Sequence, residues 1–513
     1  MDLTFLNEWV LTIITFTPVV AAVIILLLPP DKKTLIKTLA LIATAITLAL
    51  SIYVFFAYDQ GIGATEAGQF QFRQQFEWVK SLGISYHVGA DGISLPMILL
   101  TGIVAFGGVM ISWGIQERTR EFFAFFMLLV AGVFGVFVAL DLFQLFFFYE
   151  LSIFPMYILI ATWGSTRKEY AAMKLTLYLL VGSIIALVGI LAMYFSADSA
   201  AMGLPAGQRT FDFLLLQKGN IPLDIARLWF LPIFIGFGVL AGIWPFHSWS
   251  PDGHVAAPTA VSMIHAGVLM KLGAYAALRV GVELLPQAAK EMLPFVILLV
   301  LVNVVYGASI AMVQRDFKYV IGFSSVSHMG LVTMGFATMN QTGLNGAVMQ
   351  MFSHGIMTAL FFTIVGLVYD RAHTRDIPSL GGMVKVLPLA TVAFVIGGLV
   401  SMGMPGLSGF VAELQIFMGV WQARDIAAWY PWVALISATG IVITAAYVLR
   451  VTGKVFFGEY DAHKWHDMRP TNILDKVAVT MFCAILIIAG IFPPILMNMI
   501  QTGTAPLVRL LGG

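Results

Sequence analysis

Long apolar stretches alternate with short polar segments along almost the whole chain. Fourteen stretches are long enough to cross a bilayer as helices, since a span needs about 20 apolar residues. They fall at about 8–29, 35–56, 92–113, 121–140, 142–162, 173–195, 228–247, 255–280, 293–314, 317–337, 344–368, 386–420, 430–450 and 474–499. The pattern predicts an all-α polytopic membrane protein of about 14 transmembrane helices, in a single membrane domain over residues 1–513.

Two of the predicted spans contain residues that interrupt a helix. The seventh includes AGIWPFHSW at 241–249, and the twelfth includes SMGMPGLSGF at 401–410. A backbone opened at membrane depth has to be buried in protein or line a wet cavity. The breaks lie five spans apart, and an odd offset reverses the chain direction, so we predict two five-helix repeats of inverted topology, as in transporters. The alternative is that these glycines and prolines serve only close packing.

The predicted repeats divide the chain into four parts. These are helices 1–3 (1–113), the first repeat with helices 4–8 (121–280), the second repeat with helices 9–13 (293–452), and helix 14 with its tail (474–513).

The distribution of Lys and Arg predicts the orientation, because basic residues gather in cytoplasmic loops. Of the 28 Lys and Arg residues, eighteen lie on one side of the spans and nine on the side of the termini, while Lys271 lies inside a span. We therefore expect both termini on the non-cytoplasmic side. The two longest loops, at about 57–91 and 196–227, are expected there as small ordered caps.

Composition excludes several classes of function. Only 11% of residues are charged, the net charge is +1, and no basic run exceeds two residues, which argues against nucleic-acid binding. The single cysteine, Cys483, excludes a disulfide framework, a zinc cluster and an iron–sulfur site built on four thiolates. We therefore expect no metal and no cofactor in this chain, and any redox chemistry has to belong to partner proteins.

Few ionisable residues lie inside the predicted spans, and each is a candidate for function. A charge at the bilayer centre costs about 3 kcal/mol, so such residues are retained for a reason. Glu150 lies in the fifth span, Lys271 near the middle of the eighth, and Glu413 just after the break of the twelfth. The candidate histidines in or beside spans are His265, His328 and His354, and two more, His247 and His254, flank the loop after the first break.

This set of residue types favours proton or ion transfer over metal binding. Buried carboxylates, amines and imidazoles all exchange protons readily, whereas no cysteine partners or Glu-x-x-His pairs are present for a di-metal site. Each group also has a structural interpretation. Glu150 would pair with a basic group at a helix end, Glu413 would cap free amides, and a histidine would pack in the core with its hydrogen bonds satisfied.

Five segments around these residues resemble a known family. They are YELSIFPMYILIATWG around Glu150, PFHSWSPDGHVAAPTAVSMIHAGVLMKLGAYAALR around Lys271, RDFKYVIGFSSVSHMGLV around His328, FSHGIMTALFFTIVGLVYDRAHTRDIPSLGG around His354 and SMGMPGLSGFVAELQIFMG around Glu413. Over about residues 85–460 the chain is similar to the antiporter-like, proton-translocating membrane subunits of respiratory complex I, the NADH-quinone oxidoreductase, and most of all to the chain 4 (subunit M) type.

The resemblance implies a mechanism and partners. It implies a hydrated row of ionisable residues at the midplane, in which a carboxylate like Glu150 responds to the neighbouring subunit and a lysine like Lys271 passes the proton inward. Histidines like His328 and His354 would help to carry it, and a residue like Glu413 would deliver it outward. NADH, FMN, iron–sulfur clusters and quinone are expected on partner subunits. The expected surroundings are neighbouring antiporter-like subunits and the lipid bilayer of a bacterial inner membrane.

One position departs from the family pattern. Within the segment FIGFGVLAGIWPFH, family members usually carry a lysine that pairs with the fifth-helix glutamate, and this chain has Leu240 there. A buried charge left alone costs several kcal/mol. We therefore predict that Glu150 is protonated at rest or has another cation nearby, and His265 is the candidate for that cation.

Two other functions stay open. The first is a subunit of a multi-subunit cation/proton antiporter or of a membrane-bound hydrogenase, since both use similar modules. The second is a structural spacer that joins its neighbours without transport, and Leu240 is its only support. The segments YDRAHTRDIPSLGG and GMPGLSGFVAE favour the oxidoreductase. The last span lies close to the end of this sequence, without the long lateral helix of the chain 5 type, which favours chain 4.

Overall fold

Thirteen helices are long and apolar enough to cross a membrane, counted over residues 3–65, 68–465, 468 and 470–512, which the computed structural model describes. The helical spans are α1 (Leu3–Leu27), α2 (Lys33–Ala57), α4 (Ser94–Ile111), α5 (Thr119–Val138), α6 (Leu142–Trp163), α7 (Lys168–Ser196), α9 (Leu223–Ala241), the eighth span from Thr259 to Glu283, α13 (Pro286–Val313), α14 (Phe317–Ala337), α15 (Gln341–Ala372), α18 (Tyr430–Val451, continued by η8, Thr452–Phe456) and α20 (Ile473–Ile491). The twelfth span, divided into α16 (Pro388–Ser401) and α17 (Ser408–Gln422), completes the predicted fourteen.

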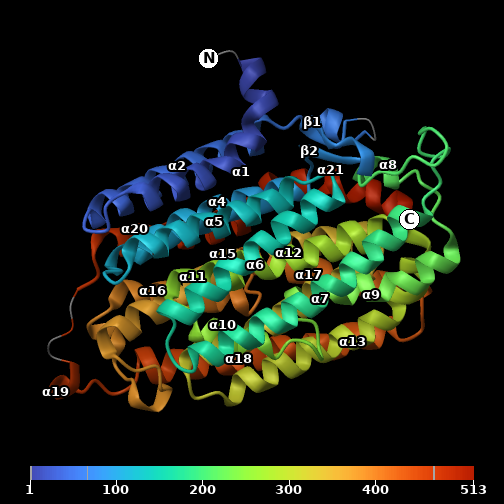
Figure 1. Cartoon of the computed structure of the whole chain (residues 1–513). Coiled ribbons are helices and arrows are strands. Elements are labelled where there is room, and N and C mark those ends of the chain that lie inside the picture. Colours follow the sequence, from blue (N-terminus) through green and yellow to red (C-terminus); the bar gives the residue numbers. More distant parts are fainter. Residues whose placement is uncertain (1–2, 66–67, 466–467, 469, 513) are drawn as a thin grey trace.

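The spans form an inner group and an outer ring. The eighth span and α15 are buried over their whole apolar windows, and α4, α5 and α14 nearly so, whereas α1, α2, α7 and α13 each have less than half of theirs buried. Figure 1 shows α12 and α15 in the middle of the bundle, with α1 and α2 along one edge. Because lipid offers no hydrogen bonds to an open backbone, apolar sequences of this length form helices there. This difference in burial shows that the inner spans pack against protein on all sides. The less buried spans of the outer ring face lipid or other subunits.

A small cap closes one end of the bundle. The loop after α2 forms α3 (Gln60–Gly63) and an antiparallel hairpin of β1 (Gln71–Val79) and β2 (Ile84–Ala90), joined by the turn η1 (Lys80–Leu82), and the loop after α7 contains α8 (Phe213–Leu216). Asp141 joins this cap to α6, because its carboxylate accepts from the Phe143 amide (2.9 Å) and from the Ser85 amide of β2 (2.9 Å). Burial raises the pKa of Asp141, although these hydrogen bonds oppose the rise. The described residues of both long loops thus contain helices or strands, and the hairpin is an addition to the all-α prediction.

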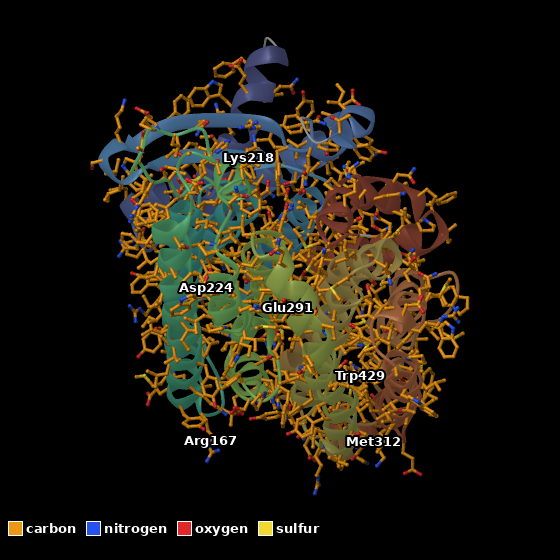
Figure 2. All side chains as sticks on the ribbon, turned by 90° about the vertical axis from the view of Figure 1, so that its right-hand side faces the viewer. Arg167, Lys218, Asp224, Glu291, Met312 and Trp429 are labelled. Atoms are coloured by element: carbon orange, nitrogen blue, oxygen red, sulfur yellow. The ribbon has the colours of Figure 1, made fainter. Side chains whose placement is uncertain are left out.

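The loops at the two ends of the bundle place the termini. Figure 2 shows Arg167 and Met312 at one edge, and Lys218, Asp224 and Glu291 away from that edge. The second group belongs to the end that carries the cap, the beginning of α1 and the end of the last helix, α21 (Pro494–Leu510). The termini of the described chain therefore share one end, as the predicted even number of spans requires.

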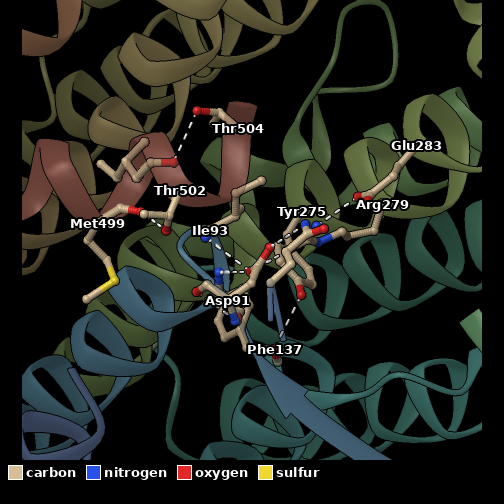
Figure 3. A network of polar contacts seen from close by, with 12 residues as sticks. Asp91, Ile93, Phe137, Tyr275, Arg279, Glu283, Met499, Thr502 and Thr504 are labelled. Carbon is tan, nitrogen blue, oxygen red and sulfur yellow. Dashed lines mark hydrogen bonds and ion pairs between the residues drawn. The ribbon is translucent and has the colours of Figure 1, made fainter. Parts of the chain in front are cut away.

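A buried ionic cluster holds the eighth span to the cap. Arg279 pairs with Asp91 (2.5 Å) and with Glu283 (2.8 Å), and the Gln217 amide donates to Glu283 (2.9 Å). Asp91 also accepts from two amides at the start of α4. Figure 3 shows Asp91 and Glu283 on either side of Arg279, with Tyr275 alongside. Buried charges are tolerated when their partners and hydrogen bonds are in place. This cluster therefore fixes the capped end of the span that carries Lys271.

Both predicted helix breaks are present. α9 ends at Ala241, Gly242 takes a left-handed conformation (φ 78°), and the chain continues as the short helix α10 (Trp249–Ala256) before the eighth span begins. The second break lies between α16 and α17. The inverted relation between two repeats, and the domain limits drawn from it, stay predictions.

The eighth span is helical throughout but is not a uniform α-helix. It consists of α11 (Thr259–Ile264), the π-turn η3 (His265–Leu269), α12 (Met270–Ala276) and the π-turn η4 (Ala277–Glu283). Single π-turns inside α-helices are frequent at functional sites. Here they bracket the segment that carries Lys271.

The last span is shorter than the sequence predicts. The apolar run 474–499 is divided at Phe492 and Pro493, where α20 ends and α21 begins. α21 packs against α15 and α4 at the capped end, and its backbone at Met499 and Gly503 comes so close to Gly92 that a Cβ there would lie 2.1 Å from the Met499 carbonyl oxygen. Hydropathy alone does not mark this break, because the first residues of α21 continue the apolar run of α20.

Asn303 of α13 satisfies the backbone that the first break opens. Its carbonyl oxygen accepts from the Trp244 amide (2.5 Å), and its amide donates to the Gly242 carbonyl (2.9 Å) and to Val326 of α14 (3.3 Å). Backbone groups at membrane depth have no water to replace such partners. One side chain therefore holds the break to two neighbouring spans.

We expect Asn303→Leu to destabilise the protein by about 2 kcal/mol or more, since each unpaired buried polar group costs about 1–3 kcal/mol. The check is the thermal unfolding midpoint of the purified protein in detergent. Ser309→Ala on the same helix is the control, because that hydroxyl bonds only within its own helix, to Val305. Equal midpoints for the two variants would contradict the role given to Asn303.

Candidate functional site

Lys271 lies at the centre of the inner group of spans and is fully buried. Its ammonium bonds to the Ala266 carbonyl inside the π-turn η3 (2.5 Å) and to Nδ1 of His354 on α15 (2.7 Å). The π-turn loosens the helical ladder, so a backbone carbonyl of the same span is available to the amine. The amine thus has a neutral oxygen and an imidazole as partners, and a proton is easily shared between the amine and the imidazole.

Beyond His354 the row continues into the second half of the chain. The ring of His328, on α14, lies 5.2 Å from the His354 ring, centroid to centroid. His328 Nδ1 lies 3.4 Å from a Glu413 carboxylate oxygen and 3.1 Å from the Gln350 amide nitrogen, and its Nε2 lies 3.0 Å from the Ser401 hydroxyl. Four spans therefore contribute to one row: Lys271, His354, His328 and Glu413.

His328 has two sets of partners that suit different protonation states. A neutral ring that accepts from the Gln350 amide at Nδ1 carries its proton on Nε2, next to Ser401. A protonated ring has a hydrogen on Nδ1 as well, and the nearest acceptor for it is Glu413. The geometry therefore allows a proton that reaches His328 to be directed to Glu413.

The second break makes room for Glu413. Ser401 is the last residue of α16, and the chain turns at Gly403 with φ 62°. A Cβ at Gly403 would lie 2.6 Å from Oε2 of Glu413 and would displace the carboxylate, and the left-handed backbone at this position also favours glycine. The break thus serves the site directly.

His265 lies beside this row, in the π-turn η3. Its ring stacks on Trp249 (5.2 Å) and meets the ring of His254 (4.2 Å), both of α10. Both ring nitrogens of His265, Nδ1 of His254 and Nε2 of His354 are buried without a protein hydrogen-bond partner among the described residues. Buried polar atoms of this kind are usually satisfied by ordered water. The two histidines of this pair therefore extend the polar interior towards the first break.

Glu150 is not part of the row. It lies on α6 at the edge of the bundle, partly exposed, with the Ser183 hydroxyl of α7 nearby, and one of its oxygens has no hydrogen-bond partner in the described part of the chain. It forms no ion pair there, and His265 contacts aromatic rings instead of this carboxylate. Leu240 is fully buried against α12, where Gly273 allows close contact. The structure thus supplies no replacement for the expected lysine.

Lys318 is a buried lysine that the sequence analysis missed. It lies two residues after Asp316, the N-cap of α14, and was counted among the basic residues of a loop. Its side chain is 4% exposed, and its ammonium donates to the Ala257 carbonyl (2.7 Å), the Ser262 hydroxyl (3.2 Å) and the Val255 carbonyl (3.5 Å). Those oxygens belong to the last turn of α10, to the turn between α10 and α11, and to α11 itself. No local signal in the sequence connects that turn to Lys318.

No group of three or more His, Cys, Asp or Glu side chains within the described residues has a metal-binding arrangement. The row instead consists of an amine, two imidazoles and a carboxylate in succession. Such a succession is chemically capable of carrying a proton, because each group can both accept and release one.

Comparisons with known proteins identify the family. The family profile described as NADH:quinone oxidoreductase/Mrp antiporter, TM matches residues 139–444. NADH-quinone oxidoreductase subunit M of Rhodobacter capsulatus is 34% identical over 511 residues, which covers 97% of this chain and 96% of the relative. NAD(P)H-quinone oxidoreductase chain 4 3 of Picosynechococcus is 34% identical over 525 residues, which covers 97% of this chain and 93% of the relative.

Two solved structures share the fold. A chain of respiratory complex I from Thermus thermophilus superposes with a TM-score of 0.87 at 23% identity, over 98% of this chain and 100% of that one. A chain of the Mrp complex from Dietzia superposes with a TM-score of 0.84 at 18% identity, over the full length of both. With the profile and the relatives, these matches show that the chain belongs to the NADH:quinone oxidoreductase/Mrp antiporter family of membrane subunits.

Proposed function

We propose that this chain is the subunit M (chain 4) of an NADH-quinone oxidoreductase and translocates protons through Lys271, His354, His328 and Glu413. The observation that carries the proposal is the row of four buried titratable groups, with contacts of 2.7 Å between the first two and 3.4 Å between the last two. It occurs in a chain that is 34% identical over nearly its whole length to a protein named subunit M.

The transfer runs from the first half of the chain to the second. The Lys271 ammonium gives a proton to Nδ1 of His354, the His354 ring passes a proton to the adjacent His328 ring, and His328 gives it to Glu413. Each donor is neutralised by its own transfer. Because the interior has a low dielectric constant, a charge that arrives at one member changes the energy of the next.

The chain supplies the proton path, and partner subunits supply the redox chemistry. NADH, FMN, iron–sulfur clusters and quinone belong to those partners in this proposal, and this chain holds no redox centre. Coupling is electrostatic. Glu150 is partly exposed at the edge of the bundle, and in this proposal it responds to an antiporter-like neighbour. His265, in the π-turn that precedes Lys271 in the same span, assists the row in this proposal.

The proposed setting is the inner membrane of a bacterium, with both termini on the non-cytoplasmic side. The excess of Lys and Arg in the opposite loops supports this orientation. Exposed apolar side chains on α1, α2, α7 and α13 suit lipid and neighbouring subunits.

A cation/proton antiporter subunit is the second candidate, and the Dietzia fold match is consistent with it. The spacer function is the third, on the basis of Leu240. Reconstitution of the intact assembly in vesicles separates the three. Proton uptake on addition of NADH and quinone, stopped by a quinone-site inhibitor, supports the oxidoreductase. Exchange of sodium for protons without NADH oxidation supports the antiporter.

In the same vesicles, we expect Lys271→Ala to slow NADH-driven proton uptake by at least about tenfold, since a positioned proton-transfer group typically contributes about 10²–10⁴-fold. Lys454→Ala, which changes an exposed lysine, is the matched control. If both variants take up protons at the rate and yield of the unmodified complex, the spacer function is correct and the relay is not.

The state of Glu150 gives a further prediction. Because no cation pairs with it within the described chain, the carboxyl should be protonated at neutral pH and show an infrared C=O stretching band in the purified complex. Glu150→Gln should remove that band, and Glu117→Gln, at an exposed position, should leave it. An unchanged carboxyl region in Glu150→Gln would mean that the group is ionised and has a cation from a neighbouring subunit.

A further inference from the structure

Gln350 of α15 is a buried side chain that the proposed relay does not use. It lies one helical turn before His354 and is 2% exposed. Residues four apart on a helix share a face, and both of these side chains lie against the His328 ring of α14. An amide exchanges no proton under these conditions, so any role of Gln350 in transfer has to act through its neighbour.

The amide of Gln350 competes with Glu413 for one atom of His328. The amide nitrogen lies 3.1 Å from Nδ1 of that ring, and Oε1 of Glu413 lies 3.4 Å from the same Nδ1. The other ring nitrogen, Nε2, lies 3.0 Å from the Ser401 hydroxyl. When Nε2 carries its hydrogen, Nδ1 has the only free lone pair of the neutral ring. A proton therefore enters and leaves His328 at the atom that Gln350 occupies.

The other end of this amide is not held in place by the described part of the chain. Oε1 of Gln350 is buried there without a hydrogen-bond partner, and so is Oε2 of Glu413. Half a turn about the last side-chain bond exchanges the nitrogen and the oxygen of the amide. Oε1 then faces Nδ1 as an acceptor for a protonated ring. The side chain therefore suits both protonation states of His328, in two orientations.

From this geometry we propose that Gln350 is a positioning residue that gates proton transfer between His328 and Glu413. While the ring is neutral, the amide donates to Nδ1 and occupies its lone pair, so a protonated Glu413 has no acceptor for its proton. When a proton reaches Nδ1 from His354, the amide has turned, and the new N–H donates to Glu413. The N–H bond breaks as the O–H bond forms, the ring becomes neutral again, and the amide returns to Nδ1. The proposal rests on the proposed function and adds the side chain that gives the last transfer its direction.

The direction of this gate follows from charge. A protonated His354 is a cation, and its ring lies 5.2 Å from the His328 ring, centroid to centroid. The cation repels the N–H end of the Gln350 amide and attracts the oxygen end, so its arrival favours the turned orientation. A protonated Glu413 is neutral and exerts no such force. The amide therefore opens Nδ1 to a proton from His354 and keeps it closed to one from Glu413.

A purely structural amide would serve to hold α14 against α15. These two helices are already in close contact elsewhere, since a Cβ at Gly335 of α14 would lie 2.7 Å from the Cβ of Ala347 on α15. Buried structural amides also have partners at both ends, whereas Oε1 of Gln350 has none among the described residues. The contact with Nδ1 of His328 is thus the feature that a role for Gln350 has to explain.

The test is the vesicle assay with NADH and quinone, run with and without an opposing proton gradient. Without the amide, Nδ1 stays open to a protonated Glu413. Because each pH unit of gradient favours the return step about tenfold, we expect a gradient of about one unit to lower proton uptake per NADH at least about twofold more in Gln350→Leu than in the unmodified complex. Gln341→Leu is the matched control, since it makes the same substitution on the same helix, where the amide bonds to Asn345 and Thr504.

Three outcomes would overturn a part of this account. Equal sensitivity to the gradient in Gln350→Leu, Gln341→Leu and the unmodified complex, with uptake lost in Lys271→Ala, would overturn the gate and leave the proposed function intact. Lower uptake in Gln350→Leu that does not depend on the gradient would also overturn the gate, because a structural residue or a carrier gives that result. Normal uptake in Lys271→Ala would overturn the proposed function itself.

Gln350→Asn keeps the test decisive if the leucine variant does not fold. It retains a buried amide, but its side chain is shorter by one methylene and no longer reaches Nδ1 of His328. We expect the same sensitivity to the gradient as in Gln350→Leu. A response equal to that of the unmodified complex would contradict the gate, because it would show that the contact with Nδ1 is not needed.

Discussion

The contact between Lys271 and His354 is the interaction on which the rest of the interior depends. This buried amine has no carboxylate partner among the described residues, and it is stabilised by a carbonyl at 2.5 Å and an imidazole at 2.7 Å. The carbonyl is available because the eighth span contains a π-turn, and the imidazole because α15 passes through the centre of the bundle. The π-turn and the central position of α15 therefore both serve to stabilise the Lys271 amine inside the bundle.

The same need explains the two helix breaks. Opening a helix in the membrane exposes carbonyls and amides, and polar side chains of neighbouring spans then bond to them: Asn303 at the first break, and Lys318 with Arg375 at the turn that follows. At the second break the freed space holds Glu413, and Ser401 at the end of α16 contacts His328. At each break, therefore, a titratable group lies beside an opened stretch of backbone. Side chains from neighbouring segments stabilise that stretch.

The sequence predicts the spans and both breaks because apolar length, glycine and proline act locally. It also predicts Lys271, His328, His354 and Glu413, since a charged or titratable residue within an apolar run is unusual on its own. The sequence does not predict that Lys318 is buried, because this residue follows the cap residue Asp316, as surface lysines often do. Its partners also lie more than 50 residues earlier in the chain. The sequence also does not predict the hairpin or the break before α21. Both depend on contacts between distant segments, within the cap and with α15.

Leu240 bears directly on how a neighbouring subunit acts on the row. It is fully buried and packs against the segment that carries Lys271, where Gly273 allows close contact. A leucine carries no charge and exchanges no proton, so this position relays nothing from Glu150 to Lys271. A protonated Glu150 is uncharged as well and exerts no unit-charge interaction on its surroundings. In the proposed function, coupling to the neighbour therefore depends on the release of the Glu150 proton, which links the protonation state of this carboxyl to the activity of the row.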